Sequence, residues 1–250
     1  MKSGSGRAHC DPFVALGEFH GVLGVGYLRR AGAAKVVNAK GVPGTLGCLA
    51  RTRREGRLVL VSSWHVLFGG GAQEGAPVWL LEEPRGARRY ERAADAWYGN
   101  IGTLRYGGQD FHVDCAIATC VHRSEPWPGA ALRAAALPPT IARPDAVSPG
   151  DLVTKTGAAT GTTAGVIIDV EFCSVAQTDG RSFKTPRQLL IRPLEDGPFS
   201  REGDSGALVV NDRNEAVGLL WGATPRGEGV ACHLAPALYG LDIVWPQARP

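Results

Sequence analysis

Residues 203–210 read Gly-Asp-Ser-Gly-Ala-Leu-Val-Val, a short polar turn that leads directly into an apolar run typical of a buried strand. A serine hydroxyl is a weak nucleophile at neutral pH, so a reactive serine has to be presented at a turn beside a general base. The flanking glycines let the backbone N–H groups of Gly203 and Ser205 turn toward a developing oxyanion without a Cβ in the way. The same four residues also suit an ordinary β-turn, and taken alone they favour neither interpretation.

A base and an acid are available earlier in the chain. His65 falls at the end of the strand predicted in LVLVSSWHVL, residues 58–67, and an imidazole with a pKa near ~6.5 accepts and returns a proton around neutrality. Asp114 stands at the mouth of an apolar strand, where a carboxylate needs a partner such as an imidazole Nδ1–H. Each also has a plainer interpretation: His65 as a core histidine bonded to a backbone carbonyl, and Asp114 as a strand-end residue that caps a turn.

The rest of the chain predicts strands and turns, because short segments rich in Val, Leu, Ile or Trp alternate with Gly, Pro, Asn or Asp. The expected strands are 21–28, 34–39, 44–50, 57–63, 77–82 and 112–121, then 151–157, 164–175, 188–194, 206–212, 216–222 and 229–234. Between the two sets, residues 126–149 hold six of the 17 prolines and favour a connector, because proline cannot donate to a β-ladder.

This count predicts an all-β fold of two six-stranded antiparallel β-barrels with a cleft between them, since closure removes exposed strand edges. We expect an N-terminal barrel over 1–125 that carries His65 and Asp114. A Pro-rich linker over 126–147 and a C-terminal barrel over 148–250 that carries Ser205 would complete the chain.

The order His65, Asp114, Ser205, together with the segments SSWHV, VDCAIA and GDSGALVV, resembles the trypsin/chymotrypsin family of serine endopeptidases from about residue 20 onward. The resemblance implies a trypsin-like fold with the active site in the cleft between the barrels. It makes His65 the general base, Asp114 the acid that orients it and Ser205 the nucleophile, with the N–H groups of Gly203 and Ser205 as the oxyanion hole. Leu220, Trp221 and Gly222 then resemble the strand that pairs with the substrate backbone.

The chain departs from the family at the substrate pocket. Trypsin-like preference for Lys or Arg depends on an aspartate six positions before the nucleophile, where this chain has Phe199. We therefore expect an apolar or small residue before the scissile bond. Four nearby acids could still restore a basic preference if loops were rearranged: Glu195, Asp196, Glu202 and Glu228.

Two further departures concern cysteine and activation. Val66 follows the base where animal members have a cysteine, which leaves Cys48 without an obvious partner and fits a disulfide-free bacterial type. Val22-Leu-Gly resembles an activation terminus only faintly. In activated members a new terminal ammonium pairs with the acid before the serine, here Asp204, so either another group neutralises Asp204 or the chain is an inactive precursor.

Composition excludes several other classes. The 27 Lys and Arg against 24 Asp and Glu give a net charge of +3, and the basic residues are scattered, so we expect no nucleic-acid partner. No apolar run reaches the ~18 residues of a membrane span and the first residues do not form a signal peptide, so we expect no membrane association and a cytoplasmic location. In a reducing compartment the six cysteines are expected to be thiols.

Two other kinds of site are set aside. His112, Cys115, Cys120 and His122 span about ten residues of one predicted strand, ~33 Å, too far for one metal ion, so we expect no metal and no cofactor. An α/β-hydrolase needs Gly-x-Ser-x-Gly with the histidine after the serine, and Ala207 breaks that motif.

The function predicted from the sequence is therefore hydrolysis of peptide bonds in a peptide or protein substrate through an acyl-enzyme. The competing hypothesis is a latent or non-catalytic peptide-binding module on the same scaffold that needs a partner or a cleavage for activity. A regulated intracellular effector, activated by a protease or a regulatory partner in stress or phage defence, is a further hypothesis.

Overall fold

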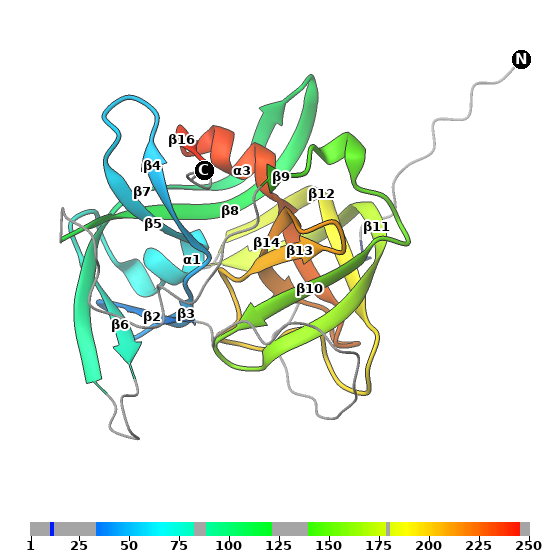
Figure 1. Ribbon diagram of the computed structural model, residues 1–250, viewed down its shortest axis with the longest axis horizontal. Coiled ribbons are helices and arrows are strands. Elements are labelled where there is room, and N and C mark those ends of the chain that lie inside the picture. Colours follow the sequence, from blue (N-terminus) through cyan, green and yellow to red (C-terminus); the bar gives the residue numbers. More distant parts are fainter. Residues whose placement is uncertain (1–10, 13–33, 83–88, 122–139, 179–180, 246–250) are drawn as a thin grey trace, which may run out of the picture.

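The computed structural model describes residues 11–12, 34–82, 89–121, 140–178 and 181–245 (Figure 1). Two β-sheets lie side by side, and the chain builds most of the first before it enters the second. This arrangement confirms the predicted all-β class. The strand predicted over 21–28 and most of the predicted linker lie outside the described residues.

The first sheet is antiparallel and has the strand order β16-β4-β5-β8-β7-β6-β2-β3. Its strands are β2 (Lys35–Asn38), β3 (Pro43–Thr45), β4 (Cys48–Thr52), β5 (Leu58–Ser62), β6 (Pro77–Glu82), β7 (Arg89–Tyr106), β8 (Gln109–Cys120) and β16 (Ile243–Val244). Strand β5 packs Leu60 against one apolar cluster and Val59 and Val61 against another. The central strands β5 and β8 are thus buried on both faces, which gives a rigid base for the residues at their ends.

The second sheet closes into a barrel of six strands in the order β11-β10-β13-β14-β15-β12, because β12 also pairs with β11. These strands are β10 (Leu152–Gly157), β11 (Gly161–Thr178), β12 (Arg181–Pro193), β13 (Leu208–Asn211), β14 (Glu215–Ala223) and β15 (Gly229–His233). Two short strands attach in parallel, β1 (Asp11–Pro12) to β11 and β9 (Thr140–Ile141) to β14.

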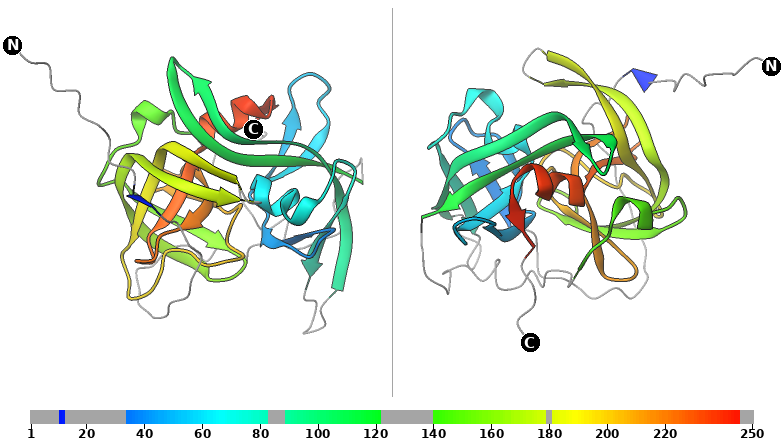
Figure 2. Two further views of the ribbon diagram at one scale, coloured as in Figure 1. Left: turned by 180° about the vertical axis from the view of Figure 1, so that it is seen from behind. Right: turned by 90° about the horizontal axis from the view of Figure 1, so that it is seen from above.

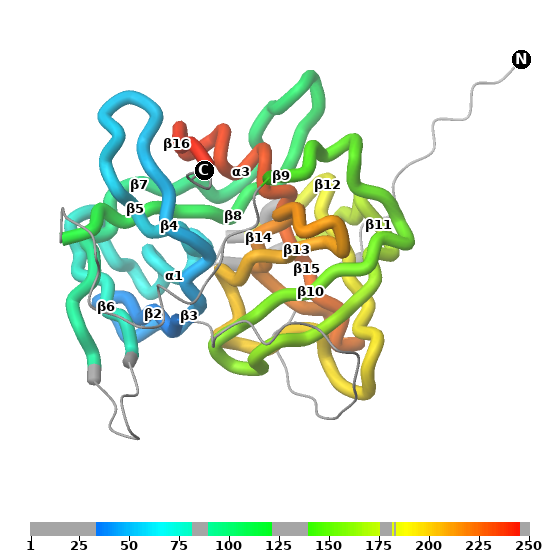
Figure 3. The backbone as a smooth tube through the Cα atoms, viewed as in Figure 1, coloured from blue at the N-terminus to red at the C-terminus, as the bar shows by residue number. Residues whose placement is uncertain are grey.

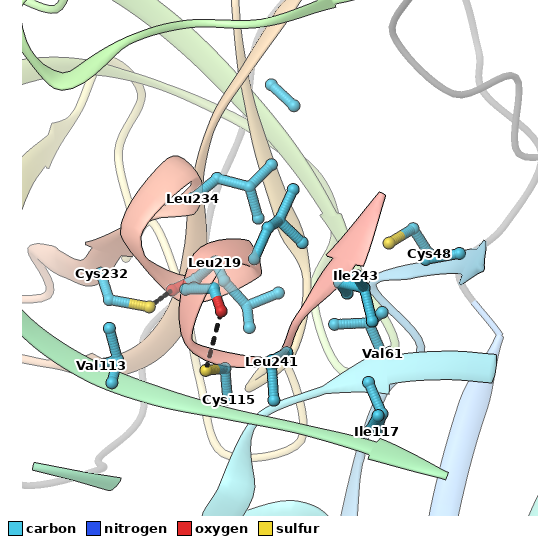
Figure 4. Close-up of a cluster of buried hydrophobic side chains, with 14 of the residues drawn as sticks. Cys48, Val61, Val113, Cys115, Ile117, Leu219, Cys232, Leu234, Leu241 and Ile243 are labelled. Carbon is cyan, nitrogen blue, oxygen red and sulfur yellow. Dashed lines mark hydrogen bonds between the residues drawn. The ribbon is translucent and has the colours of Figure 1, made fainter. Parts of the chain in front are cut away.

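The largest apolar cluster lies between the two halves (Figure 4). Val113, Cys115 and Ile117 of β8 contribute from one side, while Leu219 and Cys232 contribute from the barrel. Helix α3 (Leu234–Gly240) adds Leu234, Ala237 and Leu238 to the same cluster. Because this cluster is continuous, the two halves hold one another at a fixed separation, as a site between them requires.

The chain end returns to the first sheet (Figure 3). After α3, β16 pairs with Arg51 and Thr52 of β4, and Asp242 forms ion pairs with Arg53 and Arg54 at the surface. Ile243 and Val244, which the sequence assigned to the C-terminal barrel, therefore join the neighbouring sheet. The long β7–β8 hairpin extends from the first sheet, contacts α3 and reaches β12 of the barrel (Figure 2).

Strand β7 is the main element that the sequence pattern did not predict. Its 18 residues include arginine, aspartate, asparagine and two glycines, which read as a loop. Register shifts near Ala96 and at Val78 bend it along β8 and β6. Among the described residues, no helix has the length and apolarity that crossing a membrane requires.

Candidate active site

His65 lies in a single helical turn. Strand β5 ends at Ser62, and α1 (Trp64–Leu67) follows with Ser63 as its N-cap residue. The sequence predicted His65 at a strand end, and the structure places it three residues beyond the end of β5. Val66 and Leu67 are fully buried and anchor the turn, while the His65 side chain remains 20% exposed. A partly exposed imidazole on a fixed backbone is suited to proton transfer with a bound molecule.

Asp114 holds this imidazole. Its Oδ2 lies 2.6 Å from His65 Nδ1, and its Oδ1 accepts the His65 backbone N–H at 3.2 Å. Both carboxylate oxygens are therefore directed at one residue, 49 positions away in sequence. Burial alone would raise the pKa of Asp114, but the charge and hydrogen bonds of His65, with a smaller contribution from His112, hold it below its ordinary value. An ionised Asp114 that accepts from Nδ1 leaves Nε2 as the proton acceptor on the opposite edge of the ring.

A buried polar cluster lies behind this pair. The ring of His112 is centred 5.1 Å from the indole of Trp221, whose N–H donates to Gln188 Oε1 at 2.7 Å. Gln188 in turn donates to the His112 carbonyl at 3.1 Å. Burial lowers the pKa of His112 to about 4 in spite of nearby Asp114, so its imidazole is neutral at pH 7.

Ser205 lies in the tight turn that the sequence predicted. Gly203 and Gly206 on either side have φ of +95° and +96°, a conformation that favours glycine. The Ser205 Oγ donates to the Trp221 carbonyl at 3.4 Å, and the side chain is buried. At Gly206 an added Cβ would lie 2.2 Å from both Ser62 Oγ and the Thr45 carbonyl, so only glycine lets this turn approach the first sheet so closely.

Three contacts place the serine turn against the end of β5 that leads to His65. The Ser63 hydroxyl donates to the Leu220 carbonyl at 3.1 Å, and the Gly206 N–H donates to the same carbonyl at 2.7 Å. Gly44 lies between Val66 and Ser205, since a Cβ there would stand 2.5 Å from the Val66 methyl groups and 3.0 Å from the Ser205 carbonyl. The residue next to His65 and the serine are therefore separated by one glycine backbone.

Asp204 is neutralised by Lys155 of β10. Their side chains are both fully buried, with Lys155 Nζ 3.0 Å from Asp204 Oδ2. Asp204 Oδ1 also accepts the backbone N–H groups of Ala159 and Thr160 at 2.9 and 3.0 Å, and Oδ2 accepts the Thr160 hydroxyl and the Arg201 N–H. Burial lowers the pKa of Lys155 and the Asp204 charge opposes that shift.

The sequence pattern left open which group neutralises Asp204, and Lys155 was not predicted for this role. A signal was present, because strand alternation puts Lys155 on the same inward face as Val153 and Gly157. A lysine at an inward position of a barrel strand needs an acidic partner. The segment around Val22 lies outside the described residues.

The residues predicted to bind substrate gather on one side of the serine. Phe199 is fully buried, and its ring lies between two glycine backbones: a Cβ on Gly229 or Gly165 would stand 2.3 or 2.8 Å from ring atoms. Leu220 belongs to the same apolar cluster. Ser200, next to Phe199, donates to the Gly222 carbonyl at 3.3 Å. The segment of Phe199 and Ser200 is therefore held against Gly222, and the Phe199 ring fills the space beside it.

None of the four acids considered for a basic preference is buried. Glu195, Asp196 and Glu202 are exposed, and Glu228 is half-buried and accepts the Thr224 hydroxyl at 2.8 Å.

Buried cysteines line the core and carry thiols. Cys48, Cys115, Cys120 and Cys232 are outside disulfides, and burial raises the pKa of Cys48, Cys120 and Cys232 to about 12. Within the described residues no group of three or more His, Cys, Asp or Glu side chains has a metal-binding arrangement. His122, the fourth member of the group weighed in the sequence, lies outside that part of the chain.

A buried acid–imidazole pair and a serine in a glycine turn thus lie on a scaffold of two β-sheets. Similar structures share the scaffold. NAPase from Nocardiopsis has a TM-score of 0.52 and 15% identity, over 86% of this chain and 97% of that chain. Cellulomonas bogoriensis chymotrypsin gives 0.51 and 14%, over 88% and 99%, and alpha-lytic protease homolog N4 gives 0.53 and 19%, over 85% and 96%.

These likenesses confirm, at the level of the fold, the resemblance to bacterial trypsin/chymotrypsin-like serine proteases. No family model matches the chain. No curated protein matches it either.

Proposed function

We propose that this protein is a serine endopeptidase in which His65, Asp114 and Ser205 form the catalytic triad. The observation that carries the proposal is the pairing of both Asp114 oxygens with His65, whose neighbour Val66 is separated from the serine turn by one glycine backbone. An imidazole oriented in this way accepts the serine proton, and the carboxylate stabilises the imidazolium that forms. The likeness of the scaffold to bacterial proteases supports the same conclusion.

In the first half of the proposed reaction, Ser205 Oγ attacks the scissile carbonyl while its proton passes to His65 Nε2. The carbonyl oxygen becomes an oxyanion that the N–H groups of Gly203 and Ser205 stabilise. The C–N bond then breaks, the leaving amine takes the proton from His65, and an ester of Ser205 remains. A water molecule repeats the sequence, giving its proton to His65 and releasing the carboxylic acid.

The proposed preference is for a small residue before the scissile bond. The buried ring of Phe199 occupies the space beside Gly229 and Leu220, so a large side chain would have to displace it. The buried Phe199 side chain carries no charge at this position, which argues against a preference for Lys or Arg. Substrate recognition would then depend on the backbone of Leu220, Trp221 and Gly222 as well as on fit at this pocket.

The site is proposed to form without a cut in the chain. The ammonium of Lys155 already meets the Asp204 carboxylate, so no new terminus is required to neutralise it. This pairing favours an assembled enzyme over a precursor or a latent binding module, and it leaves a regulatory partner as a separate question. The buried thiols of Cys115 and Cys232 fit a reducing, cytoplasmic setting.

Hydrolysis by the full-length chain tests the proposal. Peptide p-nitroanilides that differ only in the residue before the scissile bond, from Ala to Phe to Arg, would be compared for kcat/KM. We expect the Ala peptide to be the best of the three and the activity to vanish in Ser205→Ala but not in Ser148→Ala, an exposed serine away from the site. Activity that survives Ser205→Ala would overturn the triad, and a preference for the Arg peptide would overturn the pocket argument.

A further inference from the structure

Thr45, at the end of β3, is a residue of the first sheet that bonds directly to the serine turn. It is fully buried, and none of the sequence motifs pointed to it. Its backbone N–H donates to the Ser205 carbonyl at 2.8 Å. Its hydroxyl donates to the Gly203 carbonyl at 2.8 Å and accepts the Ala158 N–H at 2.9 Å. Thr45 itself is fixed by Ser62, whose hydroxyl donates to the Thr45 carbonyl at 2.8 Å.

These bonds hold the two peptide groups that flank the proposed oxyanion donors. The Gly203 carbonyl belongs to the peptide group that joins residues 203 and 204, and the N–H of that group donates to the Arg201 carbonyl at 3.0 Å. With both ends of this planar group fixed, the direction of the Gly203 N–H depends only on the dihedral angles of Gly203. Glycine at φ +95° has wide freedom in those angles, so loss of the restraint on the 203–204 peptide group would leave the Gly203 N–H free to take other directions.

The same reasoning applies on the other side of the nucleophile. The Ser205 carbonyl accepts from the Thr45 N–H, and the next N–H, that of Gly206, donates to the Leu220 carbonyl. Hydrogen bonds therefore fix both ends of the peptide group after Ser205, as they do for the peptide group after Gly203. The hydroxyl of Thr45 adds a link to Ala158, which follows β10 and precedes the two N–H groups that bind Asp204.

We propose that Thr45 is a positioning residue for the oxyanion hole: its hydroxyl bridges Gly203 and Ala158, holds the peptide group after Gly203 and so restricts the directions that the Gly203 N–H can take. The inference rests on the proposed peptidase function and adds to it a contribution from the first sheet, outside the triad. Thr45 touches neither the substrate nor the reacting atoms. Its effect is therefore expected on the transition state, where the oxyanion forms, and not on binding of the ground state.

The experiment compares three variants of the full-length protein on the Ala peptide substrate. Thr45→Val keeps the shape of the side chain and removes the hydroxyl, and Thr45→Ser keeps the hydroxyl. Thr52→Val is the matched control, because Thr52 is also a buried threonine of the first sheet, and its Oγ1 accepts a backbone N–H, that of Arg57. Thermal unfolding of each variant ensures that only folded protein is compared.

We expect Thr45→Val to lower kcat about tenfold to a hundredfold with KM within threefold, since loss of a complete oxyanion donor costs ~10²–10³. A peptide aldehyde, whose adduct places an oxygen in the oxyanion hole, should bind Thr45→Val more weakly by the same factor. The cleaved product peptide should bind as it does to the wild-type protein. Thr45→Ser should stay within threefold of the wild-type kcat, as should Thr52→Val.

Three results would overturn the inference. They are an unchanged kcat in folded Thr45→Val, a fall confined to KM, and a Thr45→Ser variant as impaired as Thr45→Val. Failure of the proposed function gives a different result, because the wild-type protein itself would then show no Ser205-dependent hydrolysis, and both the function and the role of Thr45 would be wrong.

Discussion

Replacement of Lys155 by Met removes the cation that pairs with Asp204 in the interior. Methionine keeps most of the volume of the stem, so the main change is loss of the ammonium 3.0 Å from Asp204 Oδ2. Both side chains are fully buried, and water cannot take the place of the lost charge without opening the structure.

The expected loss of unfolding free energy is about 3 kcal/mol. Removal of one partner from a buried ion pair costs ~3–5 kcal/mol, because the other charge stays buried without its counter-ion. Asp204 keeps four other donors, the N–H groups of Ala159, Thr160 and Arg201 and the Thr160 hydroxyl, which places the loss at the lower end of that range. For a chain of 250 residues this corresponds to a fall in Tm of about 6–12 °C.

Urea unfolding followed by tryptophan fluorescence measures this loss, with Lys40→Met as the control at an exposed lysine. The control should stay within ~0.5 kcal/mol of the wild-type protein. In the folded fraction of Lys155→Met we also expect slower labelling by a fluorophosphonate, since Asp204 adjoins the nucleophile. A loss below ~1 kcal/mol together with full labelling would refute the assignment of Lys155 as the group that neutralises Asp204.

Three further predictions follow from single residues. Phe199→Ala should lower the unfolding free energy by about 3–5 kcal/mol, because loss of the ring leaves a cavity beside Gly229. The same cavity should raise kcat/KM for the Phe peptide relative to that for the Ala peptide. An unchanged ratio of the two kcat/KM values would contradict the proposed pocket. The folded chain holds the pKa of His112 at about 4 against an ordinary 6.5. The stabilisation that comes from keeping His112 neutral is therefore complete above pH 6.5, and about 3 kcal/mol of unfolding free energy is lost as the pH falls toward 4. Urea unfolding at pH 7 and pH 4 should show that loss reduced in His112→Gln, and an equal loss in both proteins would contradict it. Gly44→Ala should push Val66 and Ser205 apart, which lowers the unfolding free energy by about 1–3 kcal/mol and reduces kcat. A variant with unchanged Tm and kcat would show that Val66 and Ser205 are not packed tightly against Gly44.

The local chemistry of the site could be predicted from the sequence because its signals are local. A serine between glycines, a histidine after an apolar strand and an aspartate within one are each visible within a few residues. The structure brings His65 and Asp114 together and places the Ser205 turn beside them, which no single segment could show. The buried six-stranded barrel was also visible as short apolar runs that alternate with turns.

Features that depend on distant partners could not be predicted in this way. Strand β7 is polar on much of its length and becomes a strand because β6 and β8 supply hydrogen bonds on its two edges. Thr45 resembles any threonine after a glycine, and its role depends on residues 113 and 158 positions away. Lys155 was detectable by strand alternation, but its pairing with Asp204 follows only from the closed barrel.

The proposed mechanism requires Ser205 to be a nucleophile that His65 activates in the uncut chain. Peptide mapping by mass spectrometry after fluorophosphonate treatment of the full-length protein tests it most directly. We expect one adduct, on Ser205, that is lost in His65→Ala while the Tm of that variant stays close to the wild-type value. No adduct on the intact folded chain, or an adduct that persists on Ser205 without His65, would contradict it.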